Sequence, residues 1–170
     1  MTAIWARLAQ SRIHIGLASA ALAYWLARPT PGSILAGVVV AVPGEAIRIW
    51  GSGHLEKERE VTRSGPYRLV RHPLYLGSSL IGVGFAVATD RLWSAVVVVA
   101  YLAATLVAAI RTEEATLERR YGSEYAAYRA GRAPAMIRRF SWARVMSNRE
   151  YRAITGFVVA IALLWLRMRI

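Results

Sequence analysis

The chain has 170 residues, of which 56% are hydrophobic and 19% are charged, and its formal net charge is +12. The length fits one domain over residues 1–170, and the hydrophobic fraction exceeds the roughly 45–50% of soluble domains. This composition excludes a disordered chain and an ordinary soluble globule, so we expect an integral membrane protein. The absence of Cys excludes disulfides and sulfur-dependent metal sites, and with three His residues we expect no metal centre.

Five apolar runs predict an all-α integral membrane fold with about five transmembrane helices, at residues 13–27, 34–50, 74–89, 92–110 and 153–166. Several runs are shorter than the roughly 20 residues that cross a bilayer, so flanking aromatic and small residues must extend them. Asp90 and Arg91 are the only charged residues from Leu74 to Ile110, the stretch that contains runs three and four. This single short break predicts a helical hairpin. A cleaved signal peptide at the first run is the alternative, disfavoured because another apolar run follows at once.

The basic residues predict the orientation in the bilayer. A cytosolic N-terminus puts Arg7, Arg12 and the loops 52–73 and 111–152 on one face, as the positive-inside rule requires. The opposite face keeps only Arg28, Arg91, Arg167 and Arg169. The six Trp lie near run ends or in flanking segments, as interfacial anchors do: Trp5, Trp25, Trp50, Trp93, Trp142 and Trp165. The positive charge therefore requires no nucleic acid.

Residues 138–152 place Trp142, Val145 and Met146 at helical spacing among five Arg. This pattern predicts a helix lying in the headgroup layer, and a plain cytosolic linker is the alternative. Either interpretation leaves the segment facing anionic lipid.

The loop before the third run ends in the segment GPYRLVRHPLYLG, residues 65–77. Gly65-Pro66 predicts a turn, and Pro73 predicts a helix start that excludes His72 from helical geometry. A helix N-terminus surrounded by Arg and Tyr side chains favours an anionic ligand. The alternative is a set of snorkelling Arg and interfacial Tyr side chains with no ligand.

Two adjacent carboxylates, Glu113 and Glu114, follow the fourth run and are expected to continue its helix. A carboxylate at the membrane boundary needs a partner, for which Arg71, Arg111 or a cationic ligand can serve. The alternative is a solvated helix face on which Glu114 pairs with neighbours such as Arg119 and Arg120.

The order GPYRxxRHPxYxG, helical hairpin, EExxLxxxYGxxYxxY resembles the isoprenylcysteine carboxyl methyltransferase and phospholipid N-methyltransferase superfamily, over residues 48–134. The resemblance implies S-adenosylmethionine in a cytosol-facing pocket and a lipophilic acceptor that enters from the bilayer. Residue by residue, it assigns the cofactor to Tyr67, His72, Pro73, Leu74, Tyr75 and Glu113. Glu114 completes the EE pair. The Gly82-Val83-Gly84 sequence looks like a family GxG motif, but helix packing explains it better.

The chemistry of the cofactor agrees with these residue types. Glu113 can accept from the ammonium or ribose, Tyr67 or Tyr75 can face the sulfonium, and Arg71 with the helix start can hold the carboxylate. A carboxylate or thiolate acceptor needs no base, so positioning and water exclusion can supply most of the rate. An amine acceptor must first lose a proton, to His72, Glu114 or His54. Arg111 is the candidate for orienting an anionic substrate group, and Glu114 and Arg111 are the predicted catalytic residues.

Two other function classes stay open. Membrane sterol and steroid reductases, which use NADPH, carry a similar HPNYFGE segment, but residues 72–78 here lack its Asn and trailing acid. A non-enzymatic membrane scaffold leaves the two motifs without a ligand.

Two smaller predictions concern the flanking residues: Glu45 and Arg48 can pair on one helix face, and the loop from His54 to Lys57 can close over the cofactor. The methyl acceptor and the oligomeric state stay undetermined.

Overall fold

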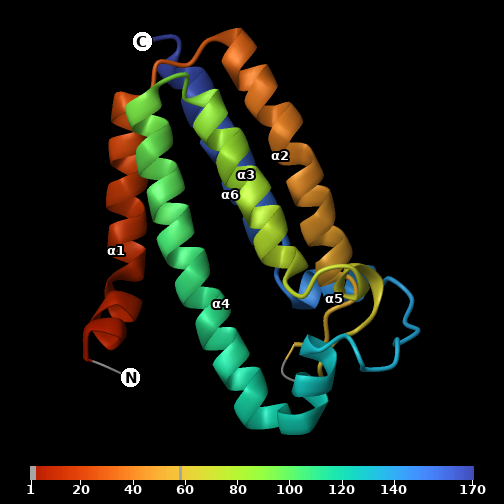
Figure 1. The fold of residues 1–170 in the computed structure, drawn as a ribbon. Helices are drawn as coiled ribbons and strands as arrows, with labels where there is room; N and C mark the ends of the chain where they lie inside the picture. The colour runs from red at the N-terminus through yellow and green to blue at the C-terminus, as the bar shows by residue number, and fades with distance from the viewer. Residues whose placement is uncertain (1–2, 58) are drawn as a thin grey trace.

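The computed structural model describes residues 3–57 and 59–170, with side chains from residue 14 onward. The described chain forms six α-helices and a 3-10 turn, and no strand (Figure 1). They are α1 (Ala3–Leu26), α2 (Pro31–Ser52), η1 (Gly65–Arg68), α3 (Pro73–Ala88), α4 (Leu92–Arg129), α5 (Trp142–Ser147) and α6 (Tyr151–Arg167). All five apolar runs lie mainly in helices, so the all-α prediction is confirmed. The side chains of Trp5, Arg7 and Arg12, which carry part of the orientation argument, lie outside the described residues.

Two helices, α2 and α4, are long and apolar enough to cross a membrane. The apolar part of α1, His14–Leu26, and α3 are shorter apolar helices, so the span count of five stays a prediction. Up to the kink at Gly122, α4 is about 45 Å long, against a bilayer core of about 30 Å. The part of α4 beyond its apolar residues 92–110 therefore projects past the end of a span.

The predicted hairpin of α3 and α4 is present. Only three residues connect the helices, and the middle one, Asp90, has a φ of 51°. The side chain of Asp90 accepts a hydrogen bond from the Thr30 hydroxyl at 3.3 Å, and the carbonyl of Thr89 accepts one from the Arg28 amide at 2.9 Å. The tight turn is thus held to the connection between α1 and α2.

Helices α2 and α3 pack with their backbones in close contact. A Cβ on Gly84 would come within 2.4 Å of the Gly37 carbonyl, and one on Gly44 within 2.6 Å of the Gly77 carbonyl. Gly82 instead faces Leu102 of α4. Small residues of this kind let helices approach in a bilayer, where apolar burial alone gives little drive. The structure therefore supports the packing interpretation of Gly82 and Gly84.

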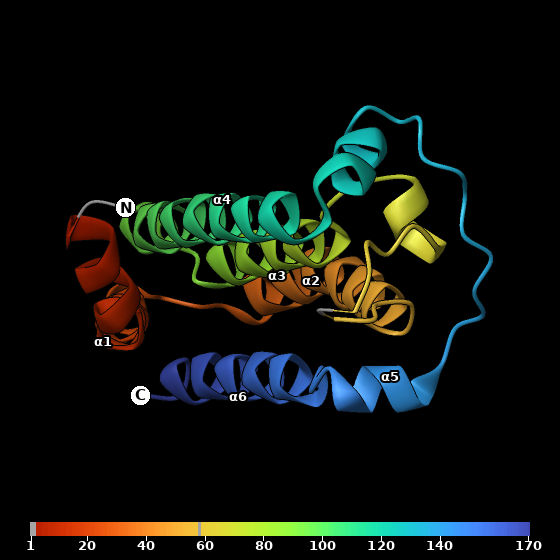
Figure 2. The same cartoon turned by 90° about the horizontal axis from the view of Figure 1, so that it is seen from below.

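The two end helices take different positions. Helix α1 packs on α4, where the Ser94 hydroxyl donates to the Ala23 carbonyl at 2.7 Å, whereas α6 runs along α2 and α3 (Figure 2). A small buried cluster joins the four helix ends remote from η1: Ala27, Ile34, Ala88 and Leu164. The connection from α4 to α5 passes around the opposite end of the bundle.

The described Trp side chains are exposed and lie close to helix ends. Trp25, Trp93 and Trp165 belong to the ends of α1, α4 and α6 that gather at one end of the bundle in Figure 1. Trp50 and Trp142 belong to the ends of α2 and α5 at the other end. This separation suits two membrane interfaces.

Helix α5 occupies part of the segment expected to lie in the headgroup layer. Trp142 and Met146 are exposed, but Val145 is 3% exposed and packs inward. Val145 anchors α5 to the protein while its two apolar neighbours face outward. The placement of this helix in the headgroup layer stays a prediction.

Candidate active site

The GPYR turn and the start of α3 take the local structure that their sequence predicts. Gly65 has a φ of 56°, a conformation that favours glycine, and it opens η1. Pro73 is the first residue of α3, and His72 before it has φ −128° and ψ 64°, outside the helical region. Tyr67 is buried in the turn, and burial raises the pKa of its hydroxyl. The predicted cofactor segment is thus a rigid turn followed by a helix start.

A bend in α4 returns the chain to this turn. Gly122 leaves helical geometry, with φ 43° and ψ −111°, and the last helical residues fold back. The hydroxyl of Tyr128 then donates to the carbonyl of Tyr67 at 2.8 Å, and Arg63 pairs with Glu124 at 3.3 Å. The local sequence signal for this bend is a single Gly in a Tyr-rich stretch, which does not by itself predict a turn.

Glu114 is held by two residues of the segment between η1 and α3. Arg71 donates to its Oε1 at 3.1 Å, and Nε2 of His72 lies 3.0 Å from the same oxygen. The hydrogen bond with His72, helped by Arg71 and opposed by burial, holds the pKa of Glu114 below its ordinary value. Of the partners expected for Glu114, Arg71 is confirmed. The alternative of pairing within the helix is wrong, since Arg119 bonds the Ala115 carbonyl instead.

The tautomer of His72 follows from this contact. An ionised carboxylate only accepts hydrogen bonds, so Nε2 of His72 carries a proton and donates a hydrogen bond to Glu114. In the neutral ring Nδ1 is then an acceptor, and it lies 4.0 Å from the Glu113 carboxylate. The His72 ring also packs at a tilt against Tyr75, with 5.7 Å between centroids.

Glu113 differs from Glu114 in its surroundings. Its side chain is 42% exposed, and the basic group that the described residues place nearest to it is His72 Nδ1, at 4.0 Å. It lies beside the Tyr75 hydroxyl. The hydroxyl of Tyr125, close to Glu114, is buried without a hydrogen-bond partner among the described residues. Burial, with a smaller effect of the Glu114 charge, raises the pKa of Tyr125 to about 12.

The remaining predicted site residues are placed less directly. Pro73 is buried against Gly51 of α2, and the carbonyl of Leu74 accepts from Arg48 at 3.3 Å. Arg111 is exposed and makes no hydrogen bond or ion pair within the described residues. The structure thus brings together Tyr67, Arg71, His72, Tyr75, Glu113 and Glu114, whereas it gives Arg111 no contact with them.

The predicted pair of Glu45 and Arg48 does not form. Arg48 donates through Nε to Glu150 at the start of α6 at 2.7 Å and also bonds the hydroxyl of Ser78. Both carboxylate oxygens of Glu45 are buried without a hydrogen-bond partner in the described chain. The physical reason is tertiary: Glu150 is 4% exposed and needs a cation, and its charge-assisted bond outcompetes a pair within one helix.

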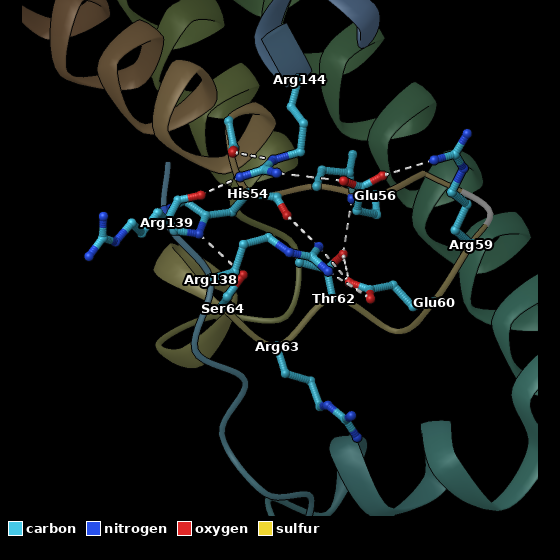
Figure 3. A network of polar contacts seen from close by, with 12 residues as sticks. His54, Glu56, Arg59, Glu60, Thr62, Arg63, Ser64, Arg138, Arg139 and Arg144 are labelled. Carbon is cyan, nitrogen blue, oxygen red and sulfur yellow. Dashed lines mark hydrogen bonds and ion pairs between the residues drawn. The ribbon is translucent and has the colours of Figure 1, made fainter. Parts of the chain in front are cut away.

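His54 lies in a second polar network, between the loop after α2 and the segment before α5 (Figure 3). It is buried, and its Nδ1 lies 3.2 Å from the Ser64 hydroxyl. Burial, reinforced by the charges of Arg144 and Arg138, lowers the pKa of His54. Sequence reasoning missed this network because residues 130–150 carry no motif beyond their basic composition.

The contacts of Glu114 predict a pH dependence of stability. Because its folded pKa lies below its ordinary value of 4.5, these contacts stabilise the fold above that pH and lose their effect as pH falls through the folded pKa. We expect Glu114→Gln to have a lower thermal midpoint than the wild type near neutral pH. Unfolding scans in detergent should show this difference shrinking below about pH 4.5. A difference that is constant over that range would contradict the assignment.

The family model for phospholipid methyltransferases matches residues 31–124. The chain belongs to this family. The matched range begins at the start of α2 and ends after the EE pair, so it contains the GPYR turn, the α3–α4 hairpin and both carboxylates. Membership confirms the superfamily to which the sequence motifs point.

Two curated relatives carry names that concern metal resistance. The nickel-cobalt-cadmium resistance protein NccN of Alcaligenes xylosoxydans xylosoxydans is 32% identical over 114 residues, 66% of this chain and 51% of that protein. The cobalt-zinc-cadmium resistance protein CzcN of Cupriavidus metallidurans is 36% identical over 107 residues, 62% of this chain and 47% of that protein. The chain thus spans about half the length of these relatives. No solved structure matches it significantly.

Proposed function

We propose that this family member transfers a methyl group from S-adenosylmethionine to a lipophilic acceptor at the membrane. The observation that carries the proposal is the contrast between the two carboxylates. Glu114 is satisfied by Arg71 and His72, whereas Glu113 is partly exposed beside Tyr75 and lacks a close cation among the described residues. A carboxylate in that position suits a cationic ligand.

The residues of the site fit the chemical groups of this cofactor. Glu113 would accept from the ammonium or the ribose hydroxyls, and the Tyr67 and Tyr75 rings would face the sulfonium. Arg71 and the start of α3 would hold the carboxylate. When bound, the cofactor supplies an activated methyl group; the protein's task is to position the acceptor and exclude water.

The acceptor decides whether a base is needed. A carboxylate or thiolate attacks directly, whereas an amine must first lose a proton. His72 is placed for that task, because Glu114 fixes its Nε2 proton and leaves Nδ1 as an acceptor. Glu114 thus acts by orienting His72, and Arg111, exposed on the first turn beyond the apolar part of α4, would orient an anionic substrate group.

The proposal also includes the side of the membrane on which the site lies and the residues that form the domain. The EE pair, η1 and the loop 52–64 lie at the end of the bundle to which the positive-inside argument assigns the cytosol. We therefore propose a single domain over residues 1–170, with the site on the cytosolic side and an acceptor that enters from the bilayer. The isoprenylcysteine, lipid amine and lipid thiol acceptors all suit such an entrance.

Cofactor binding is the experiment that tests the proposal. We expect S-adenosylmethionine to bind saturably to the detergent-purified chain in calorimetric titration and to transfer labelled methyl groups into a membrane lipid extract. NADPH, titrated in parallel, should not bind. Saturable NADPH binding without S-adenosylmethionine binding would assign the chain to a reductase chemistry, and binding of neither would favour the scaffold function.

A further inference from the structure

The segment before α5 is bonded to the loop after α2 by a forked ion pair. The Arg138 guanidinium donates to Glu60 at 2.6 Å and 2.8 Å, one bond to each carboxylate oxygen. The same guanidinium donates to the His54 carbonyl at 3.2 Å (Figure 3). The Arg138 and Glu60 side chains are 20% and 25% exposed, so solvent screens the pair only in part. Such forked pairs add geometric specificity to their energy.

Further bonds join the same two parts of the chain. Arg144 donates through Nε to the Gly53 carbonyl at 2.7 Å, and the Ser141 amide donates to the same carbonyl at 3.1 Å. The Asn148 side chain donates to the carbonyls of Ser52 and Leu55 at 3.0 Å and 3.1 Å. The Ser52 and Gly53 carbonyls lie at the C-terminal end of α2, where carbonyls have no partner within the helix, so these bonds satisfy them.

The loop in turn supports the GPYR turn by direct packing. The ring of Phe140 lies against Gly53, and the His54 ring lies so close to Gly65 that a Cβ there would meet its Cδ2 at 2.5 Å. Gly65 has positive φ and is the first residue of η1. Because the His54 ring lies against it, the ring limits the position of the turn. Tyr67 follows two residues later. Contacts therefore run from Arg138 through His54 to Gly65, which belongs to the same short turn as Tyr67.

We propose that residues 138–148 form a clasp that positions the turn carrying Tyr67, with Arg138 as its principal positioning residue. The inference rests on the proposed function, since Tyr67 is assigned there to the methyl donor. It assigns a role to a segment that lies entirely outside the family match, which ends at residue 124. Arg138 touches no reacting group and acts through His54.

Charge reversal across the clasp tests this proposal. We expect Arg138→Glu and Glu60→Arg each to speed amide hydrogen exchange in residues 61–68 of the detergent-purified chain, and to raise the KM for S-adenosylmethionine about tenfold with little change in kcat. The double variant restores the ion pair but not the bond to the His54 carbonyl, so it should recover most of both losses. Arg138→Gln introduces no charge repulsion, so it replaces the charge-reversal variants in this experiment if one of them fails to fold.

Arg139→Glu is the matched control, because it makes the same charge change one residue away. The Arg139 side chain is exposed and makes no hydrogen bond or ion pair with any described residue. Equal exchange and KM in the Arg138 and Arg139 variants would overturn the clasp, as would faster exchange with an unchanged KM. If the wild type binds no S-adenosylmethionine, the proposed function fails by itself, and exchange still decides whether the clasp holds the turn.

Discussion

Glu113→Gln is expected to weaken S-adenosylmethionine binding by about 10- to 100-fold, because hydrogen bonds to a charged group contribute roughly 1.5–3 kcal/mol. The change keeps the shape of the side chain and removes the charge that would attract the ammonium or sulfonium. Since Glu113 makes no close ion pair among the described residues, its loss should leave the fold intact. Titration calorimetry on purified variants measures the affinity, and thermal unfolding checks the fold.

Glu118→Gln is the matched control for this experiment. Glu118 lies on the same helix, and its ion pair with Arg129, at 2.6 Å, joins two side chains that are about half exposed. Neutralising it makes the same change in net charge outside the proposed site. Equal affinities of the Glu113 and Glu118 variants would remove Glu113 from the binding site. A loss confined to Glu113→Gln would support the assignment of Glu113 to the binding site.

The largest loss of stability is expected for Gly84→Leu. A Cβ at this position would meet the Gly37 carbonyl at 2.4 Å and the Ala41 Cβ at 2.8 Å, so α2 and α3 would have to separate. Overpacking of a tight interface costs about 1–3 kcal/mol or more, and here the obstacle is backbone, which cannot rotate away. We expect a markedly lower thermal midpoint in detergent, together with loss of the site that α2 and α3 support.

Gly156→Leu provides the comparison for Gly84. Gly156 lies in α6, and a Cβ built there meets nothing within 4 Å. The same substitution should therefore leave the thermal midpoint near that of the wild type, or raise it, because Leu favours the helix more than Gly does. Equal destabilisation by the two substitutions would mean that close packing of α2 on α3 is unimportant.

The helices and the local turns of the site could be predicted because local signals specify them. Pro73 both permits a helix start and excludes His72 from the helix, and Gly65 suits the positive φ that begins η1. The hairpin followed from one short charged break between two apolar runs. These features depend on residues within a few positions of one another, so they can be inferred without knowing the rest of the fold.

The contacts between distant segments could not be predicted in the same way. Local spacing paired Arg48 with Glu45, but in the fold Arg48 bonds Glu150, 102 residues away. Local spacing also made Arg119 a candidate partner for Glu114, which instead bonds Arg71 and His72. Pairs along a helix contribute only about 0.2–0.5 kcal/mol, so a partly buried partner from another segment readily replaces them.

The sequence by itself determined the composition of a membrane protein, the helical runs and the two motifs that identify the family. Only the tertiary structure decided how the site is assembled: Gly122 bends α4 so that Tyr128 reaches Tyr67, and Arg138 fastens the loop that supports the same turn. The physical reason is the range of the interactions. Hydropathy and turn preferences act within one segment, whereas a buried polar group binds whichever partner the packed chain brings to it.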